Sequence, residues 1–144
     1  MNLTEHFTYE EITGSSTASK LGINNKYPLA LADNIHTLVV GLERVRGLLN
    51  VPMIINSGYR CPDLNVAVGG VPDSAHVQGY AADFTAPQFG DPLAIVNFLK
   101  DTDLVFDQII QEGTWVHVSF APTMRREVLT AHFNGTHATY TEGS

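Results

Sequence analysis

The pattern that most constrains the fold of this chain is a set of two histidines and one aspartate carried by two distant segments. His76 and Asp83 are seven residues apart around Gly79, which lets the chain bend, and His117 follows later in the sequence. Two imidazoles and one carboxylate can bind zinc and leave its fourth tetrahedral position open. An open position is typical of catalytic zinc sites, where the metal activates water. A fold that uses this set must bring all three side chains together.

Both segments that would supply the second and third ligands alternate like β-strands. Over residues 115–120, alternation places His117 on the face opposite three apolar residues, Val116, Val118 and Phe120. Over residues 81–85, the same rule separates Asp83 from Ala82 and Phe84. Two strands can therefore bring an acid and an imidazole to one polar face. The alternative is that Asp83 caps a turn and His117 is a core histidine, but the order and spacing of the motifs favour a metal site.

Three helices are predicted from periodicity and capping signals. Over residues 28–50 the apolar positions step by four and three, which is typical of a helix with one buried stripe: Leu31, Ile35, Leu38, Leu42, Val45 and Leu49. Thr8 and Glu11 fit a capping box for a short first helix. Asp91 followed by Pro92 predicts the start of a helix that runs to about residue 100.

Strands are interleaved with these helices. We expect strands over residues 53–57, 81–85, 106–111, 115–120 and 126–132, with residues 112–114 as a hairpin turn. Because the order follows no strict βαβ rhythm, we predict an α+β fold, an antiparallel sheet with helices packed mainly on one face. The chain is expected to be one domain, residues 1–144, with a polar C-terminal tail over about residues 133–144.

Composition limits the partners of the protein. The net charge is −7, and the eight basic residues are mostly scattered, which argues against binding to a nucleic-acid backbone. No stretch approaches the roughly 20 apolar residues that cross a bilayer, so membrane insertion is not expected. The start of the sequence has neither the basic nor the apolar region of a secretion signal. We expect a monomer.

Several motifs together resemble one peptidase family. The pattern Ser-x-His-x-x-Gly-x-Ala-x-Asp from Ser74 to Asp83, followed by Trp-x-His ending at His117, is similar to the M15 family of zinc D,D-carboxypeptidases and L-alanyl-D-glutamate peptidases. Residues 57–65 match the segment in which these enzymes carry an arginine, and residues 7–11 and 17–25 resemble a small single-domain branch common in bacteriophages. The likeness runs from about residue 5 to about residue 132.

This resemblance implies a metal, a substrate and three ligands. His76, Asp83 and His117 would hold one Zn²⁺ per chain, and the substrate would be the stem peptide of bacterial peptidoglycan. The bond stays open between D-alanyl-D-alanine and L-alanyl-D-glutamate. The resemblance implies a phage lysis enzyme that stays in the host cytoplasm until it is released to the cell wall. The alternative is a non-hydrolytic, zinc-stabilised cell-wall-binding or virion structural component.

Three further residues are candidates for substrate binding. Arg60 follows a predicted strand end, where a planar guanidinium can hold a carboxylate through two hydrogen bonds; the resemblance implies that it anchors substrate or stabilises the oxyanion. The alternative is an exposed arginine paired with Asp63 or Asp73. Ser74 either donates to substrate or only caps a turn. Tyr59 is a candidate for the cleft wall, whereas Trp115 is expected in the core.

The general base is the least constrained part of the site. Many members of the family place an acid three residues before the last zinc histidine, where this chain has Thr114. Glu112 lies five residues before His117, a spacing at which some D-alanyl carboxypeptidases carry a histidine. An odd offset in an unbroken strand points the wrong way, but Gly113 can break the alternation and turn Glu112 toward the metal. We predict Glu112 as the base rather than an ordinary turn carboxylate, ahead of Asp107 and Asp73.

Overall fold

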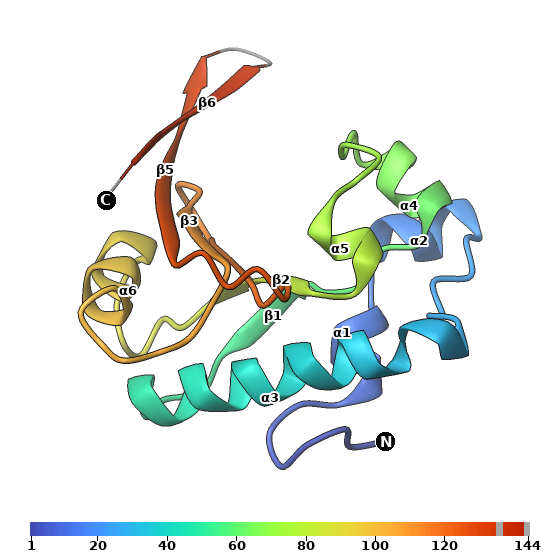
Figure 1. The fold of residues 1–144 in the computed structure, drawn as a ribbon. Helices are drawn as coiled ribbons and strands as arrows, with labels where there is room; N and C mark the ends of the chain where they lie inside the picture. The colour runs from blue at the N-terminus through green and yellow to red at the C-terminus, as the bar shows by residue number, and fades with distance from the viewer. Residues whose placement is uncertain (135–136, 143–144) are drawn as a thin grey trace.

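A six-stranded sheet with the strand order β1-β2-β4-β3-β5-β6 organises the chain (Figure 1). The computed structural model describes residues 1–134 and 137–142. All neighbouring strands are antiparallel except β3 and β5, which are parallel. The strands are β1 (Ile54–Ser57), β2 (Ala81–Thr85), β3 (Gln108–Gln111), β4 (Val116–Ser119), β5 (Glu127–Asn134) and β6 (His137–Glu142). The predicted α+β fold, in a single domain, is confirmed.

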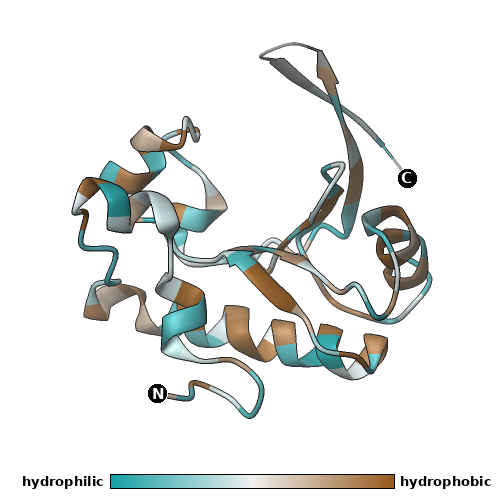
Figure 2. Cartoon of the chain, turned by 180° about the vertical axis from the view of Figure 1, so that it is seen from behind, coloured by the Kyte–Doolittle hydropathy of each residue, from teal (hydrophilic) through white to brown (hydrophobic). Residues whose placement is uncertain are grey.

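The long helix packs its apolar stripe against one face of this sheet. It forms as a short 3-10 turn, η1 (Leu29–Leu31), that continues into α3 (Ala32–Leu49). Hydrophobic and hydrophilic stretches alternate along α3 in Figure 2, and the predicted stripe is buried from Ile35 onward. The helix α6 (Pro92–Leu99) adds apolar residues to the same core, and its predicted N-cap is present, since Asp91 accepts from the Ala94 backbone N–H at 2.9 Å.

The remaining four helices among the described residues are short. The predicted capping box begins α1 (Tyr9–Thr13), because the Thr8 hydroxyl accepts from the Glu11 N–H and the Glu11 carboxylate accepts from the Thr8 N–H, both at 3.1 Å. The helices α2 (Ser16–Leu21), α4 (Pro62–Ala67) and α5 (Ala75–Gln78) were not predicted. They are too short for a periodic pattern to appear. Within the described ranges, every helix falls short of the length and apolar content that a membrane crossing requires.

The C-terminal segment differs from the predicted polar tail. The strand β5 continues to Asn134, and residues 137–142 form β6, which pairs antiparallel with β5. Its threonines and Tyr140 favour a strand, and an antiparallel strand can remain polar when one face is not packed on the core. Residues 135–136 and 143–144 of the predicted tail lie outside the described residues.

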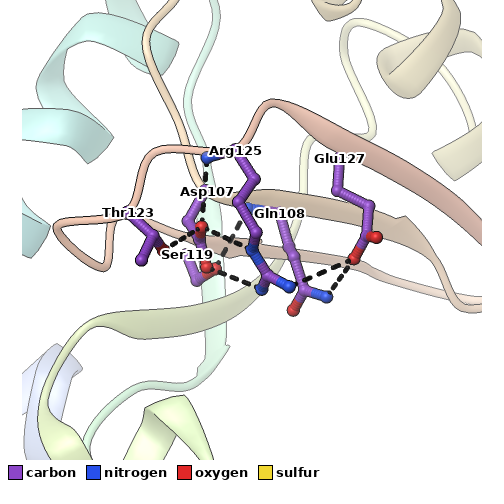
Figure 3. Close-up of polar contacts among 6 residues, drawn as sticks. All are labelled: Asp107, Gln108, Ser119, Thr123, Arg125 and Glu127. Atoms are coloured by element: carbon purple, nitrogen blue, oxygen red, sulfur yellow. Dashed lines mark hydrogen bonds and ion pairs between the residues drawn. The ribbon is translucent and has the colours of Figure 1, made fainter.

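One buried carboxylate holds the loop that leads from β4 to β5. Asp107 accepts hydrogen bonds from the Thr123 hydroxyl at 2.7 Å and from the Arg125 backbone N–H, Nε and Nη2 at 3.1, 2.9 and 3.0 Å (Figure 3). Hydrogen bonding from Arg125 lowers the pKa of Asp107 to about 2. In the same loop, Met124 and Arg126 have backbone φ angles of 41° and 53°, which residues other than glycine rarely adopt. The loop therefore depends on Asp107 to hold an unfavourable backbone.

We expect Asp107→Asn to lower the free energy of unfolding by about 1 to 3 kcal/mol, because the loop loses its ion pair and an amide NH2 replaces one of the two acceptor oxygens that bind Arg125. The folded pKa of Asp107 is depressed, so its stabilisation is fully present above about pH 4 and is lost as the pH falls toward 2. Urea unfolding of variant and wild type, with a chelator throughout, should differ at pH 7 and converge in acid. The exposed Asp103→Asn is the matched control. Equal stability at pH 7 would contradict this role.

Candidate metal centre

Two adjacent strands and one short helix bring the three predicted ligands together. Asp83 in β2 and His117 in β4 are direct cross-strand partners, so their side chains leave the same face of the sheet. His76 lies in α5 and is 2% exposed. That helix ends at Gly79, whose φ of 82° turns the chain back toward β2. The chain from His76 to Asp83 therefore consists of the end of α5, a left-handed glycine and the start of β2.

The donor atoms of these three residues converge. His117 Nδ1 lies 3.0 Å and His76 Nε2 lies 3.3 Å from the same oxygen, Asp83 Oδ1. One ligand atom from each residue lies within 4.8 Å of the others. Burial works to raise the pKa of Asp83, but the neighbouring His117 and His76 outweigh it and hold that pKa well below its ordinary value. The carboxyl group is therefore an anionic ligand at neutral pH.

The position of the His76 ring suits a cation at this cluster. Its Nδ1 lies 2.7 Å from the Gly58 carbonyl oxygen, which can only accept, so Nδ1 carries the proton. Burial lowers the pKa of His76 although Asp83 opposes the shift, and a neutral ring with its proton on Nδ1 turns the Nε2 lone pair toward the cluster. That lone pair faces an oxygen of Asp83, and two acceptors at this distance repel each other. A metal ion among the three residues would remove that repulsion, and the Gly58 carbonyl orients the ring as backbone carbonyls behind metal-bound histidines do.

A cleft of about 960 Å³ opens above these ligands. Arg60, Ser74, Glu112 and Trp115 line it together with the three candidate ligands. Tyr59, predicted for the cleft wall, is instead a core residue that is 3% exposed and packs edge-on against Tyr27 at 6.0 Å between ring centroids. The residue before Arg60 is therefore turned inward, while Arg60 itself faces the cleft.

Arg60 lines the cleft with an unused donor. Its Nε–H is buried and has no hydrogen-bond partner, and no ion pair joins it to Asp63 or Asp73 among the described residues. Burial lowers the pKa of Arg60, while the charges of Asp83 and Glu112 oppose that shift. A buried guanidinium donor without a partner costs free energy unless a ligand accepts from it.

Glu112 lies on the metal side of the sheet, but for a different reason from the one predicted. Ile110 pairs with His117 across the β3–β4 hairpin, and the Glu112 N–H donates to the Trp115 carbonyl at 3.0 Å. Glu112 is two residues beyond Ile110 and therefore shares the face of His117 without any break in alternation. Gly113, with a φ of 83°, closes the turn.

The environment of Glu112 makes its carboxylate more basic. Burial raises the pKa of Glu112, and the charge of Asp83 raises it further. His117, the Trp115 indole and Arg60 act in the opposite direction without reversing the shift. A carboxylate with a raised pKa beside a metal site is suited to accept a proton.

The other acid candidates and Ser74 have different positions. The Asp107 carboxylate is engaged by Thr123 and Arg125, so it is not available as a base. Asp73 lies exposed at the cleft, and Thr114 is exposed in the β3–β4 turn. Ser74 caps α5 by accepting from the His76 N–H at 3.2 Å, and it also lines the cleft.

Trp115 was expected in the core but lines the cleft. It is two residues from His117 and therefore faces the same side of the sheet. Its indole N–H is buried beside the Glu112 carboxylate, whose pKa it lowers. The same alternation that placed His117 could have identified this position from the sequence.

The comparison with protein families agrees with this geometry. A model of the family Peptidase M15 matches residues 5–119. Because the match covers most of the chain and contains the three candidate ligands, Arg60 and Glu112, the protein belongs to the peptidase M15 family. Among curated proteins, none matches this chain.

We expect the purified protein to contain about one zinc ion per chain, and Asp83→Asn to lose most of it, because the variant removes the anionic ligand without changing its size. Elemental analysis after desalting measures both. His36→Ala removes an exposed histidine outside the cluster and should keep the zinc content of the wild type. An active protein that is free of metal would contradict the prediction.

Proposed function

We propose that this member of the M15 family is a zinc-dependent peptidase that cleaves a bond in the stem peptide of bacterial peptidoglycan and serves as a phage lysis enzyme. The observation that carries the proposal is the convergence of His76, Asp83 and His117 in a cleft that also contains Arg60 and Glu112. The protein would act as a monomer after release from the host cytoplasm to the wall.

The three converging side chains would hold one zinc ion through His76 Nε2, an Asp83 oxygen and His117 Nδ1. When bound, zinc supplies a Lewis acid that polarises a carbonyl and lowers the pKa of water. His76 is held in the correct tautomer by the Gly58 carbonyl, and Asp83 is held opposite His117 by the strand register. The protein therefore presents its ligands already oriented.

Glu112 would act as the general base. Its raised pKa suits a group that takes a proton from the attacking water and then gives it to the leaving amine. The β3–β4 hairpin places it on the same face as His117, at the edge of the cleft. Since Thr114 cannot accept a proton at neutral pH and Asp107 is engaged elsewhere, Glu112 is the best-placed carboxylate.

Arg60 would bind the negative charge of the substrate. Its buried Nε–H has no partner among the described residues, so a substrate carboxylate or the developing oxyanion can accept from it. Ser74, whose hydroxyl lines the same cleft, would contact the peptide beside it. Both residues belong to the part of the chain that the family model matches.

Two bonds are candidates for cleavage. Phage relatives often cut L-alanyl-D-glutamate, while the spacing of Glu112 from His117 is closer to that of D-alanyl-D-alanine carboxypeptidases. Digestion of purified peptidoglycan and mass spectrometry of the products separates them, because the first bond yields new N-terminal D-glutamate and the second releases D-alanine. The absence of both products would contradict a peptidase.

A second candidate function is a non-hydrolytic, zinc-stabilised wall-binding or virion component. Thr114 favours it, because many relatives carry an acid at this position. This alternative predicts a protein that sediments with purified wall and releases no peptide from it.

We expect Arg60→Lys to keep the zinc content and the fold but to reduce kcat/KM by more than about tenfold, because an ammonium lacks the planar fork of donors. Initial rates on purified peptidoglycan or a soluble stem peptide measure this. Arg44→Lys, at an exposed position outside the cleft, is the control. Near-normal kinetics would make Arg60 an ordinary structural residue.

We expect Glu112→Gln to keep its zinc while turnover falls by about 10²-fold or more, because the amide retains size and hydrogen bonding but cannot take the proton. Glu5→Gln, an exposed carboxylate far from the cleft, serves as the control. Loss of zinc in Glu112→Gln would make Glu112 a ligand or structural residue. Unchanged hydrolysis would exclude it as the base.

A further inference from the structure

The β5–β6 hairpin forms a wall of the cleft beyond the region that the family model matches. The match ends at residue 119, whereas β5 and β6 lie within residues 127–142. In Figure 1 this hairpin extends away from the rest of the sheet, next to β3. Phe133 from β5 and Tyr140 from β6 line the same cleft as the candidate metal ligands.

The strand register explains how Tyr140 reaches the site. Gln111 pairs with Thr130, so continuing the register by one residue aligns Glu112 with Ala131, and Ala131 pairs with Tyr140. The alanine methyl is the only side chain between Glu112 and Tyr140 in this row. A small residue there leaves space for the phenol ring to lean toward the cleft.

Phe133 ties the same hairpin to the turn that carries Glu112. A methyl group placed on Gly113 would lie 3.8 Å from Phe133 Cε2, which is ordinary van der Waals contact. The Phe133 ring therefore lies close to the β3–β4 turn, although the residue is 59% exposed. The position of the hairpin is thereby linked to the position of Glu112.

Exposed apolar side chains line the cleft around its polar residues. Tyr140 is 51% exposed on the hairpin, while Val68 and Val71, which line the cleft from the segment after α4, are 43% and 62% exposed. Exposed apolar residues that gather around one cleft are typical of a binding site. A stem peptide offers a matching combination, because its short apolar alanyl side chains alternate with polar peptide groups.

We propose that Tyr140 is a substrate-binding residue, whose hydroxyl donates a hydrogen bond to the bound stem peptide while its ring and Phe133 pack against an alanyl side chain. The inference rests on the proposed function and adds to it a binding wall that the matched part of the chain does not contain.

The hydroxyl is available for this role. No hydrogen bond found among residues 1–134 and 137–142 uses the Tyr140 hydroxyl. Burial, together with the charges of Glu112 and Asp83, raises the pKa of Tyr140, so its O–H remains a donor at neutral pH. A neutral donor complements Arg60, which would bind the charged part of the same peptide.

Tyr140→Phe removes only the hydroxyl and should raise KM about three- to tenfold with little change in kcat, the effect of one lost neutral hydrogen bond. Zinc content and thermal midpoint should stay at wild-type values. The probe is a soluble stem peptide, L-alanyl-D-glutamyl at one end and D-alanyl-D-alanine at the other. Tyr9→Phe, which also deletes a hydroxyl but lies in the Tyr27 ring contact away from the cleft, is the matched control.

Calorimetry of the same peptide with zinc-loaded Glu112→Gln separates this inference from the proposed function. In the Glu112→Gln background, adding Tyr140→Phe should raise the Kd of the peptide by the same factor as KM. If the wild type does not cut the peptide but its binding still weakens without the hydroxyl, the peptidase proposal fails and the role of Tyr140 stands. If the wild type cuts and Tyr140→Phe changes neither KM nor Kd, the role of Tyr140 is overturned and the peptidase stands. A peptide that neither binds nor is cut overturns both.

Discussion

The cross-strand pairing of Asp83 with His117 is the contact on which the rest of the site depends. Their neighbours Phe84 and Val116 pair on the opposite face of the same strands and are fully buried against α3. A shift of one residue would turn both ligands into the core and two large apolar side chains into the cleft. The hydrophobic core therefore sets the register, and the register places the ligands. This coupling lets a polar site stay ordered with few hydrogen bonds of its own.

His76 is the candidate ligand whose surroundings best suit a cation. It comes from α5, a helix of four residues that could not be stable alone, and it is buried with its Nδ1–H bonded to the Gly58 carbonyl. The remaining nitrogen faces the Asp83 carboxylate without a proton to share. Metal binding would relieve this repulsion and also stabilise the short helix, so part of the metal-binding free energy would appear as folding free energy.

Periodicity predicted the elements that are long or that alternate strictly. The stripe of α3, the strand β2 and the capping of α1 and α6 were all confirmed, since each depends on neighbours in the sequence. The helices α4 and α5 were missed because a single turn shows no period. The polar strand β6 was missed because its partner β5 supplies most of its stabilisation. Glu112 lies on the face of His117, but through continued alternation and not through a break at Gly113, because the sequence shows an offset within a segment and not the pairing across a hairpin.

The buried carboxylate of Asp107 holds the loop that leads into one wall of the cleft. The chain leaves β4, passes β3 and starts β5 on its other side, and Asp107 at the beginning of β3 binds this loop through Thr123 and Arg125 (Figure 3). The Glu127 N–H then donates to the Asp107 carbonyl at 2.9 Å, so β5 begins parallel to β3. That direction carries β5 along β3 to the turn at Glu112, where the Phe133 ring lies close to Gly113. Because an antiparallel β5 would have run the other way, the contacts of Asp107 with this loop and with Glu127 help to decide which residues of the C-terminal hairpin face the cleft.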